Sequence, residues 1–292
     1  IVSDGCGSAS RAKEGAEFLT QKLIAPLGEL AADISRRGPG DWVIDEVVLT
    51  IANLRKSMRA EFQNQILDYS ATLVAVVCSS SGGFFIHLGD GIGLALGQSG
   101  EPTEGNLREV ARTNPENGEY VNETFYLTES NWLHHLRISP FGKWDLLLLC
   151  TDGAQDLLFN GIVAEPKPIE SLISSLSFSK PDDETVIERF FGHPLAQSKS
   201  GDDKTCLILA HKDLFSREIK QWKLFHDQSD LQTSRDLTEK IIETRIEKFT
   251  PYHEGFSDHE GFSAGKDKIL ESKKWCGFKI KKIYNYLIMT FR

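Results

Sequence analysis

Three apolar segments of this chain lie beside an aspartate, and this pattern constrains the fold more than any other feature of the sequence. Asp4 follows the apolar start of the chain, Asp152 follows Leu146–Cys150, and Asp202 precedes Cys206–Ala210. Uninterrupted apolar runs of this kind are typical of buried strands. Carboxylates at strand ends supply the hard oxygen ligands that Mg²⁺ and Mn²⁺ prefer. The pattern therefore predicts that the three aspartates meet in the fold and hold a cation.

A fourth aspartate, Asp90, lies between two glycines at the end of an apolar segment. Apolar strands over 70–78 and 84–90 are joined by a Ser-Gly turn, and a further strand follows over 91–96. The simplest interpretation is a hairpin with Asp90 at its tip. An ordinary turn residue is the alternative for Asp90. Its place at a strand end favours the cation site only because three other carboxylates share that place.

Helical periodicity is present on both sides of these strands. Apolar residues recur at three-to-four spacing over 11–27 and over 42–66, which predicts two amphipathic helices, each covering one face of a sheet. A polar, glycine-rich stretch over 98–131 is predicted to form a long surface loop. Further helices are predicted directly after Asp152 and, in part, over 167–195.

A second acidic pair, Asp182-Asp183, resembles Asp202-Asp203 in its neighbouring residues. Charged residues at helical spacing follow the first pair, whereas an apolar run follows the second. Acidic residues are favourable at the first turn of a helix because they complement its dipole. The first pair is therefore predicted to begin a helix, and the second pair to contribute to the site.

The composition is that of an ordinary globular protein. The 292 residues include 40% apolar and 26% charged side chains, enough for one large domain or two smaller ones. The net charge is −9, and the acidic excess lies in residues 1–210, while the rest of the chain is net basic. An acidic body argues against a nucleic-acid surface and suits cation binding.

The sequence favours a cytoplasmic protein. No apolar run reaches the ~20 residues that a membrane span requires, and the N-terminus lacks the basic and apolar regions of a signal peptide. The five cysteines form no C-x-x-C pair, which favours a reducing compartment over a disulfide framework or a zinc cluster. The chain begins inside an apolar strand and without Met, so we expect it to be a fragment.

Residues 212–292 are predicted to form a helical, basic C-terminal extension to a first domain over 1–211. Two apolar patches in this segment have amphipathic spacing, and lysines alternate with aromatic and aliphatic residues over 266–292. A basic amphipathic end can dock on its own acidic domain, on a partner or on an anionic membrane surface.

The aspartates favour phosphoryl chemistry assisted by metal ions. Two cations that share one carboxylate can clamp a phosphoryl group and acidify the attacking water between them. Gly5 leaves room for a backbone carbonyl to approach a cation as well. The sequence contains no G-x-S-x-G elbow, no P-loop and no strand-borne G-x-G-x-x-G, which are the signatures of competing chemistries.

Five short motifs resemble, in order and spacing, those of the metal-dependent type 2C (PPM) Ser/Thr protein phosphatases. They cover residues 1 to about 210, and the first motif looks closest to a bacterial branch of that family. The motifs are Asp4-Gly5-Cys6-Gly7-Ser8, Ser70-Ala71-Thr72, Leu88-Gly89-Asp90, Cys150-Thr151-Asp152-Gly153 and Asp202-Asp203-Lys204-Thr205. Each motif is short, but five in register make the resemblance specific.

The resemblance implies an α+β fold of the αββα type, with two central antiparallel sheets flanked by helices and the metals in the cleft between the sheets. It implies that Asp4 bridges two Mg²⁺ or Mn²⁺ ions and that Gly5 lends its carbonyl to one. It also implies that Asp152 and Asp202 hold the other ion and that Asp90 serves a third, weaker one. The catalytic residues are then Asp4 and Asp152.

The activity implied by the resemblance is the hydrolysis of phosphoserine and phosphothreonine in proteins. Metal-bound hydroxide would attack phosphorus directly, without a phospho-enzyme, and the phosphorylated protein substrate would come from a cognate Ser/Thr kinase. The sequence departs from the family in three places. An earlier acidic motif with a phosphate-gripping Arg is not in the sequence, Ile92-Gly93 replace a frequent Arg, and Cys6 stands where some members have His. The alternative is therefore a catalytically weak or inactive phosphatase-like module that binds a partner.

Overall fold

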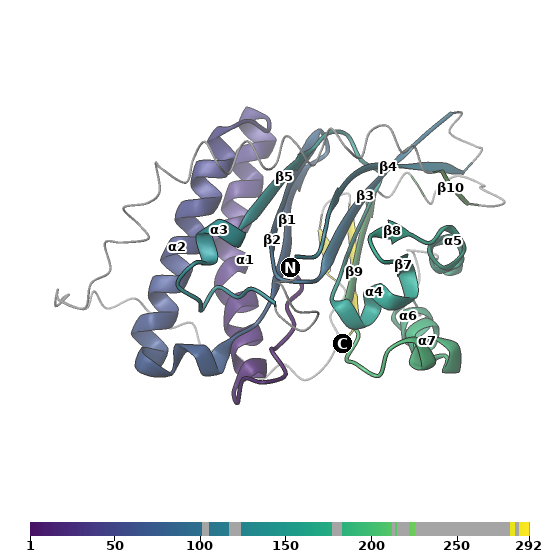
Figure 1. Ribbon diagram of the computed structural model, residues 1–292. Helices are drawn as coiled ribbons and strands as arrows, with labels where there is room; N and C mark the ends of the chain where they lie inside the picture. Colours follow the sequence, from purple (N-terminus) through teal and green to yellow (C-terminus); the bar gives the residue numbers. More distant parts are fainter. Residues whose placement is uncertain are drawn as a thin grey trace.

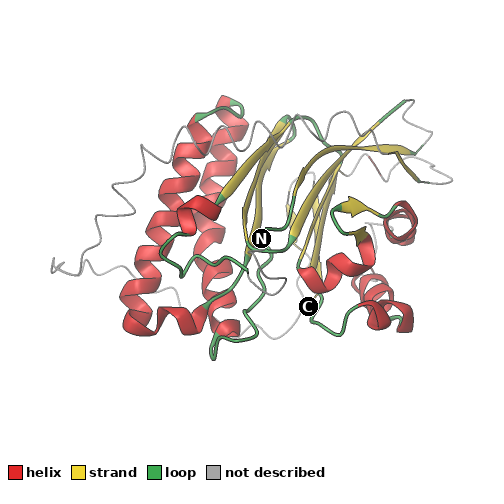
Figure 2. Ribbon diagram, viewed as in Figure 1, coloured by secondary structure: helices red, strands yellow, loops and turns green. Residues whose placement is uncertain are grey.

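Two sheets lie face to face at the centre of the structure, and helices cover the outer face of each sheet (Figure 1). Figure 2 shows the resulting four layers, with the strands between two groups of helices. The computed structural model describes residues 1–100, 105–116, 124–176, 183–211, 214, 222–225, 281–283 and 286–291. The αββα architecture predicted from the sequence is thus confirmed.

Two long helices form one outer layer. Helix α1 spans Ala12–Arg37 and α2 spans Trp42–Phe62, and a 3₁₀ turn, η1, follows over Gln63–Tyr69. Both helices bury an apolar stripe, as their periodicity predicts. Helix α1 is longer than its predicted segment, because it continues through Pro26 and ends at Gly38, whose φ is 78°.

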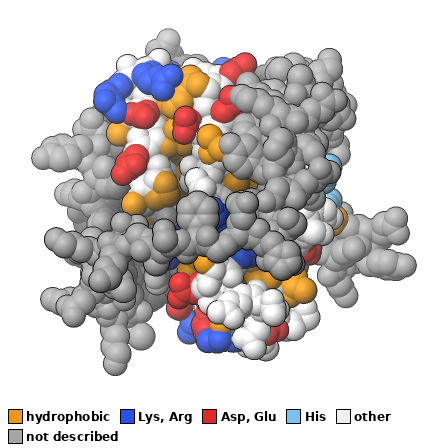
Figure 3. Space-filling view, turned by 90° about the vertical axis from the view of Figure 1, so that its left-hand side faces the viewer, with side chains coloured by type: hydrophobic (Ala, Val, Ile, Leu, Met, Phe, Trp, Pro, Cys, Tyr) orange, Lys and Arg blue, Asp and Glu red, His pale blue; other side chains and the backbone are white. Residues whose placement is uncertain are grey.

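The outward face of this helical pair is a mixed surface. Figure 3 views the molecule from the side of α1 and α2. On the visible, described part of that face, acidic, basic and apolar side chains are interspersed. Such a mixture is typical of helix faces that contact solvent.

The first sheet is three-stranded and antiparallel. Its strands are β1 (Leu73–Ser79), β2 (Gly82–Leu88) and β5 (Arg137–Phe141), in the order β1-β2-β5. The start of the chain joins this sheet through antiparallel bridges of Val2 with Val74 and of Gly5 with Ala71. Asp4 therefore belongs to the first sheet.

The second sheet has seven strands in the order β10-β4-β3-β6-β9-β12-β11. The strands are β3 (Ile92–Gln98), β4 (Asn106–Thr113), β6 (Leu146–Cys150), β9 (Cys206–His211), β10 (Lys223–Phe225), β11 (Lys281–Ile283) and β12 (Tyr286–Phe291). All pairs are antiparallel except β10 with β4, which is parallel. The sheet is therefore mixed, where the expectation was a purely antiparallel one.

The predicted hairpin with Asp90 at its tip is wrong. β2 and β3 lie in different sheets, so that Gly89-Asp90-Gly91 crosses from one sheet to the other. Gly89 has a φ of 114°, and a Cβ on Gly91 would lie 2.6 Å from Val74 Cγ2 and 2.8 Å from the Cys150 carbonyl oxygen. The crossing requires glycines because L side chains fit neither that conformation nor that space.

Short helices cover the outer face of the second sheet. They are α4 (Asp152–Leu158), α5 (Pro166–Ser175), α6 (Asp183–Gly192) and α7 (Pro194–Lys199), with a small β7-β8 pair (Phe159–Asn160, Val163–Ala164), while α3 (Trp132–His135) packs with the first layer. Helix α6 begins at Asp183, as predicted. Among the described residues, no helix combines the length and apolar character needed to cross a membrane.

Three apolar clusters hold the four layers together. One packs α1 and α2 on the first sheet, around Leu19, Ile51 and Ile86. A second lies between the sheets and includes Phe85 and Trp144. A third packs α4 to α6 on the second sheet. Burying apolar surface in all three interfaces fixes the spacing of the sheets, and so the spacing of the strand ends.

Strands make up most of the described part of the C-terminal segment, where helices were predicted; Leu214 is helical. β10 pairs with β4, and β12 pairs with β9 from Tyr286 opposite His211 to Phe291 opposite Cys206. These strands extend the same sheet that carries β6. The second apolar patch, the start of the first and the side chains of the basic end lie outside the described residues, so the domain boundary at residue 211 stays a prediction.

Candidate functional site

Asp4 is held by the strand that it accompanies. The Asp4 amide donates to Thr72 Oγ1 at 3.0 Å, and the Thr72 amide donates to the Asp4 carbonyl oxygen at 2.8 Å. The Ser3 hydroxyl donates to the Thr72 carbonyl oxygen at 2.5 Å. Thr72 therefore fixes the backbone on both sides of the Asp4 side chain. The Asp4 carboxylate itself accepts from the Gly5 amide at 2.9 Å.

Gly5 lies where the turn passes closest to helix α1. A Cβ at Gly5 would lie 2.8 Å from Ala12 Cβ and 2.9 Å from the Ala12 carbonyl carbon. Such contacts are too short for a side chain, so a residue larger than glycine would push the turn away from the helix. Glycine at this position keeps Asp4 against the start of α1.

Asp152 is the first residue of helix α4. The amides of Ala154 and Gln155 donate to the Thr151 carbonyl oxygen, which begins the helix, and the Gly153 amide donates to Asp152 Oδ1 at 2.7 Å. A carboxylate at this end of a helix is stabilised by the free amides and the dipole.

The loop of Asp202 packs directly on this helix start. The Thr205 amide donates to Thr151 Oγ1 at 3.1 Å, and the Thr151 amide donates to the Thr205 carbonyl oxygen at 3.0 Å. A Cβ on Gly153 would lie 2.3 Å from the Asp203 carbonyl oxygen and 3.2 Å from Asp202 Cβ. The motif that carries Asp152 and the motif that carries Asp202 therefore pack against each other, although 55 residues separate Cys150 from Thr205 in the sequence.

The structure brings the predicted carboxylates together. Asp4 and Asp152 share a side-chain hydrogen bond, and the charge of Asp202 acts on both. Burial and then the charge of Asp152 raise the pKa of Asp4 from 3.8 to about 7. Burial and then the charge of Asp90 raise the pKa of Asp152. These shifts follow because buried like charges disfavour the ionised form.

Asp90 approaches the cluster from the crossing between the sheets. Its Oδ2 accepts from the Thr124 hydroxyl at 2.7 Å. The preceding carbonyl oxygen, of Gly89, accepts from Arg137 Nη2 and from the Glu116 amide, both at 3.0 Å. The turn that carries Asp90 is thus fixed by three different parts of the chain.

Charge compensation for the four aspartates does not come from the described part of the protein. Within those residues, no Lys, Arg or His forms an ion pair with Asp4, Asp90, Asp152 or Asp202. No group of three or more His, Cys, Asp or Glu side chains there already forms a set that could hold a metal ion. Asp4 and Asp152 are hydrogen-bonded to each other instead, and Asp202 is exposed.

Cys6 and Tyr126 lie beside the carboxylates. Burial favours a higher pKa for the Cys6 thiol, but hydrogen bonds with the Ser8 and Tyr126 hydroxyls and with backbone amides outweigh it and lower this pKa. Burial, followed by the interaction with Cys6, raises the pKa of Tyr126. Sequence analysis indicated no role for Tyr126 or Thr124, because both lie in the polar stretch over 98–131 and belong to no motif.

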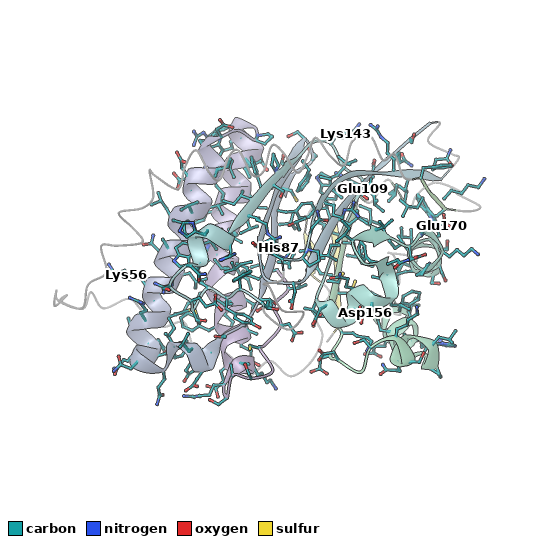
Figure 4. All side chains as sticks on the ribbon, in the orientation of Figure 1. Lys56, His87, Glu109, Lys143, Asp156 and Glu170 are labelled. Carbon is teal, nitrogen blue, oxygen red and sulfur yellow. The ribbon has the colours of Figure 1, made fainter. Side chains whose placement is uncertain are left out.

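A separate polar centre lies between the sheets, close to Asp90 in sequence. His87, on β2, is fully buried and its Nδ1 is 2.6 Å from Thr113 Oγ1 on β4 (Figure 4). Burial and then the charge of Arg137 lower the pKa of His87 well below 6.5. Arg137 Nε lies 3.5 Å from Glu116 Oε2, and Glu116 Oε1 lies 3.0 Å from His135 Nδ1. Single polar residues within strands carry no motif, so sequence analysis missed this centre.

Comparisons with known proteins identify a family and several similar solved structures. A family model described as protein phosphatase 2C matches residues 1–190. Among solved structures, the Ser/Thr phosphatase Stp1 from Staphylococcus aureus is 15% identical, with 71% of this chain and 81% of that chain covered and a TM-score of 0.48. The Ser/Thr phosphatase PstP/Ppp of Mycobacterium tuberculosis is 18% identical, with 70% and 84% covered and a TM-score of 0.44. No match was found among curated proteins.

Proposed function

The chain belongs to the protein phosphatase 2C family, and on that premise we propose that it is a metal-dependent phosphoprotein phosphatase. It would hydrolyse phosphoserine and phosphothreonine and so oppose a Ser/Thr kinase. The observation that carries this proposal is that Asp4 and Asp152 interact directly, that the charges of Asp90 and Asp202 act on Asp152, and that no described basic residue pairs with any of the four.

The donor set suits a hard divalent cation. All four side chains offer carboxylate oxygens, which Mg²⁺ and Mn²⁺ prefer over nitrogen and sulfur. The raised pKa values of Asp4 and Asp152 show that their negative charges are poorly compensated by the protein. A cation would supply that compensation and favour the ionised form of both carboxyl groups.

The residues that would hold the ions are those that the resemblance to the family implies. Asp4 would be shared by two ions, with the Gly5 carbonyl as a further ligand of one. Asp152 and Asp202, which lie on touching loops, would hold the other. Asp90, at the crossing between the sheets, would serve a third, weaker ion.

Bound Mg²⁺ or Mn²⁺ would supply an acidified water and would neutralise charge on the phosphoryl group. The role of the protein is to keep the carboxylates ionised, spaced and oriented. Thr72 contributes by accepting a hydrogen bond from the Asp4 amide, and Thr151 contributes by accepting one from the Thr205 amide in the loop that carries Asp202. Cys6, whose thiol pKa is lowered, and Tyr126 border the site on the side of α1.

The decisive experiment is p-nitrophenyl phosphate hydrolysis with and without Mn²⁺. Wild-type protein is expected to turn over only with the ion, and Asp152→Asn is expected to lose about 100-fold or more, because a catalytic metal is worth several kcal/mol. Asp156→Asn is a matched control, since Asp156 is exposed on the same helix α4 (Figure 4).

Two results would count against the proposal. Turnover that is independent of Mn²⁺ and survives Asp152→Asn would show that the aspartates do not carry the chemistry. Mn²⁺ binding without turnover of p-nitrophenyl phosphate or a phosphopeptide would favour the alternative, a binding module that keeps the metal site.

A further inference from the structure

One lysine lies in the middle of the Asp202 loop, and its side chain is turned into the protein. Lys204 is only 5% exposed. Its Nζ donates to the Ser200 carbonyl oxygen at 2.7 Å and to the Asp202 carbonyl oxygen at 2.9 Å. Lysine is seldom buried unless its ammonium is hydrogen-bonded, because removing the charge from water is costly. Burying this ammonium therefore costs free energy, and the hydrogen bonds that it makes require an explanation.

The two acceptors define the shape of the loop. Ser200 and Asp202 are two residues apart, so a single ammonium bound to both carbonyl oxygens holds the backbone in a tight bend. The Ser200 hydroxyl accepts from the Asp202 amide at 3.2 Å inside the same bend. Charge-assisted hydrogen bonds of this kind are stronger than those between neutral groups. Lys204 is thus the strongest donor that acts on the backbone of Asp202.

The bend also contacts the motif that carries Asp152. The Asp203 carbonyl oxygen lies against Gly153, and Thr205 is hydrogen-bonded to Thr151 at the base of the loop. The Thr151 and Gly153 contacts fix the loop at residues 202–205 and leave the bend that begins at Ser200 to be fixed from elsewhere. Asp202 is exposed, and its Oδ1 accepts from the Asp203 amide at 2.9 Å, so the direction of the carboxylate depends on the backbone of this bend.

We propose that Lys204 is a positioning residue for the cation site, which bends the loop through the Ser200 and Asp202 carbonyl groups so that the Asp202 carboxylate is directed at Asp152 and Asp4. This inference rests on the proposed function, because it concerns the ligand that Asp202 would provide. Lys204 itself touches neither the ions nor the substrate.

Geometry and charge make opposite predictions here, which gives the proposal a sharp test. As a nearby positive charge, Lys204 would weaken the binding of a divalent cation, and its removal would tighten binding. As a positioning group, its removal would weaken binding. Residues that orient a metal ligand typically change metal affinity by about 10- to 100-fold.

The test is Mn²⁺ binding by isothermal titration calorimetry to the full chain, with the metal alone as the probe. Lys204→Met keeps the apolar stem and removes the ammonium, and it is expected to weaken binding by about 10-fold. Lys204→Arg keeps the charge and the donors and is expected to restore most of the affinity. Lys199→Met removes an exposed lysine of α7 and should bind as wild type does.

A double variant separates positioning from general destabilisation. If Lys204 acts through Asp202, then Lys204→Met should cost little further affinity once Asp202→Asn has removed the carboxylate. A merely structural lysine would weaken both backgrounds equally and would lower the melting temperature of the metal-free protein in proportion. Should Lys204→Met fail to fold, Lys204→Gln, which keeps an N–H donor without the charge, carries the same comparison.

The outcomes separate this inference from the function on which it rests. Wild-type affinity, or tighter binding, in Lys204→Met with normal Mn²⁺ binding by the wild type overturns the positioning role and leaves the phosphatase proposal standing. Equal losses with and without Asp202 overturn it as well. If the wild type does not bind Mn²⁺ at all, both proposals fall.

Discussion

Two polar regions, whose members His87 and Asp90 are only three residues apart on the chain, differ in how their charges are compensated. Around His87, the protein supplies both signs: Arg137 lies near Glu116, and Glu116 near His135. At the aspartate edge, four carboxylates approach one another and the described residues supply no basic partner. A region that satisfies its own charges stabilises the fold, whereas one that leaves them unsatisfied is prepared for a ligand. This difference associates the region of the four aspartates, and not the region around His87, with function.

The largest expected effect concerns the unsatisfied region. Asp4→Asn should reduce Mn²⁺-dependent turnover by about 100-fold or more, because Asp4 is the proposed shared ligand. The same substitution should raise the free energy of unfolding of the metal-free protein at pH 8 by about 1 kcal/mol, after allowance for solvent screening. Turnover assays and urea unfolding in EDTA measure the two effects. If Asp4→Asn destabilised the metal-free protein instead, the charge of Asp4 would not be uncompensated, and the two regions would no longer differ in this respect.

A smaller and opposite effect is expected in the satisfied region. Arg137→Met removes the donor to the Gly89 carbonyl oxygen and the cation beside Glu116. The free energy of unfolding should fall by about 2–3 kcal/mol, since one partner of a mostly buried pair is left alone. Arg36→Met, at an exposed pair on α1, should change it by less than about 0.5 kcal/mol. Urea unfolding compares the two variants. Equal stability of both would contradict the stabilising role assigned to the region around His87.

The pH dependence of metal-free stability gives the finest comparison. The pKa of Asp4 is raised to about 7, so its stabilising contribution is present below 3.8 and is lost as the pH rises through 7. The pKa of His87 is lowered below 6.5, so its contribution is present above 6.5 and is lost as the pH falls below that value. Urea unfolding in EDTA at a series of pH values measures both, and the contribution of Asp4 is expected at about 1 kcal/mol after allowance for solvent screening.

Single variants assign the two slopes. Relative to wild type, Asp4→Asn should gain stability progressively from pH 4 to pH 7, and His87→Gln should lose the acid-side decline. Parallel pH profiles for wild type and Asp4→Asn would mean that the pKa of Asp4 is not raised by its surroundings.

The parts of the fold that follow from local pattern could be predicted from the sequence. Leu146–Cys150 and Cys206–Ala210 are buried β6 and β9 because their apolar runs have one stable solution, a central strand. Their neighbouring aspartates approach each other because adjacent strands place their ends side by side. The role of these aspartates as metal ligands stays a prediction.

Other parts depend on tertiary context that the sequence does not express. β2 and β3 are both fully buried, so no alternation of polar and apolar residues indicates which sheet each strand joins. β10 has three residues, too few for any period, and its apolar neighbours fit a helix equally well. The burial of Lys204 could not be predicted from its motif, since it depends on carbonyl groups whose positions the sequence does not reveal.

The crossing at Gly89-Asp90-Gly91 and the bridging of Val2 to Val74 give the aspartate edge a mechanical property. Asp4 is bridged to the first sheet, Asp152 and Asp202 adjoin strands of the second, and Asp90 lies on the covalent link between them. In the proposed site, an ion shared by these carboxylates would act as a cross-link between two halves of a sandwich. A shift of one sheet relative to the other would then change the spacing of the carboxylates, and with it the affinity for the ion.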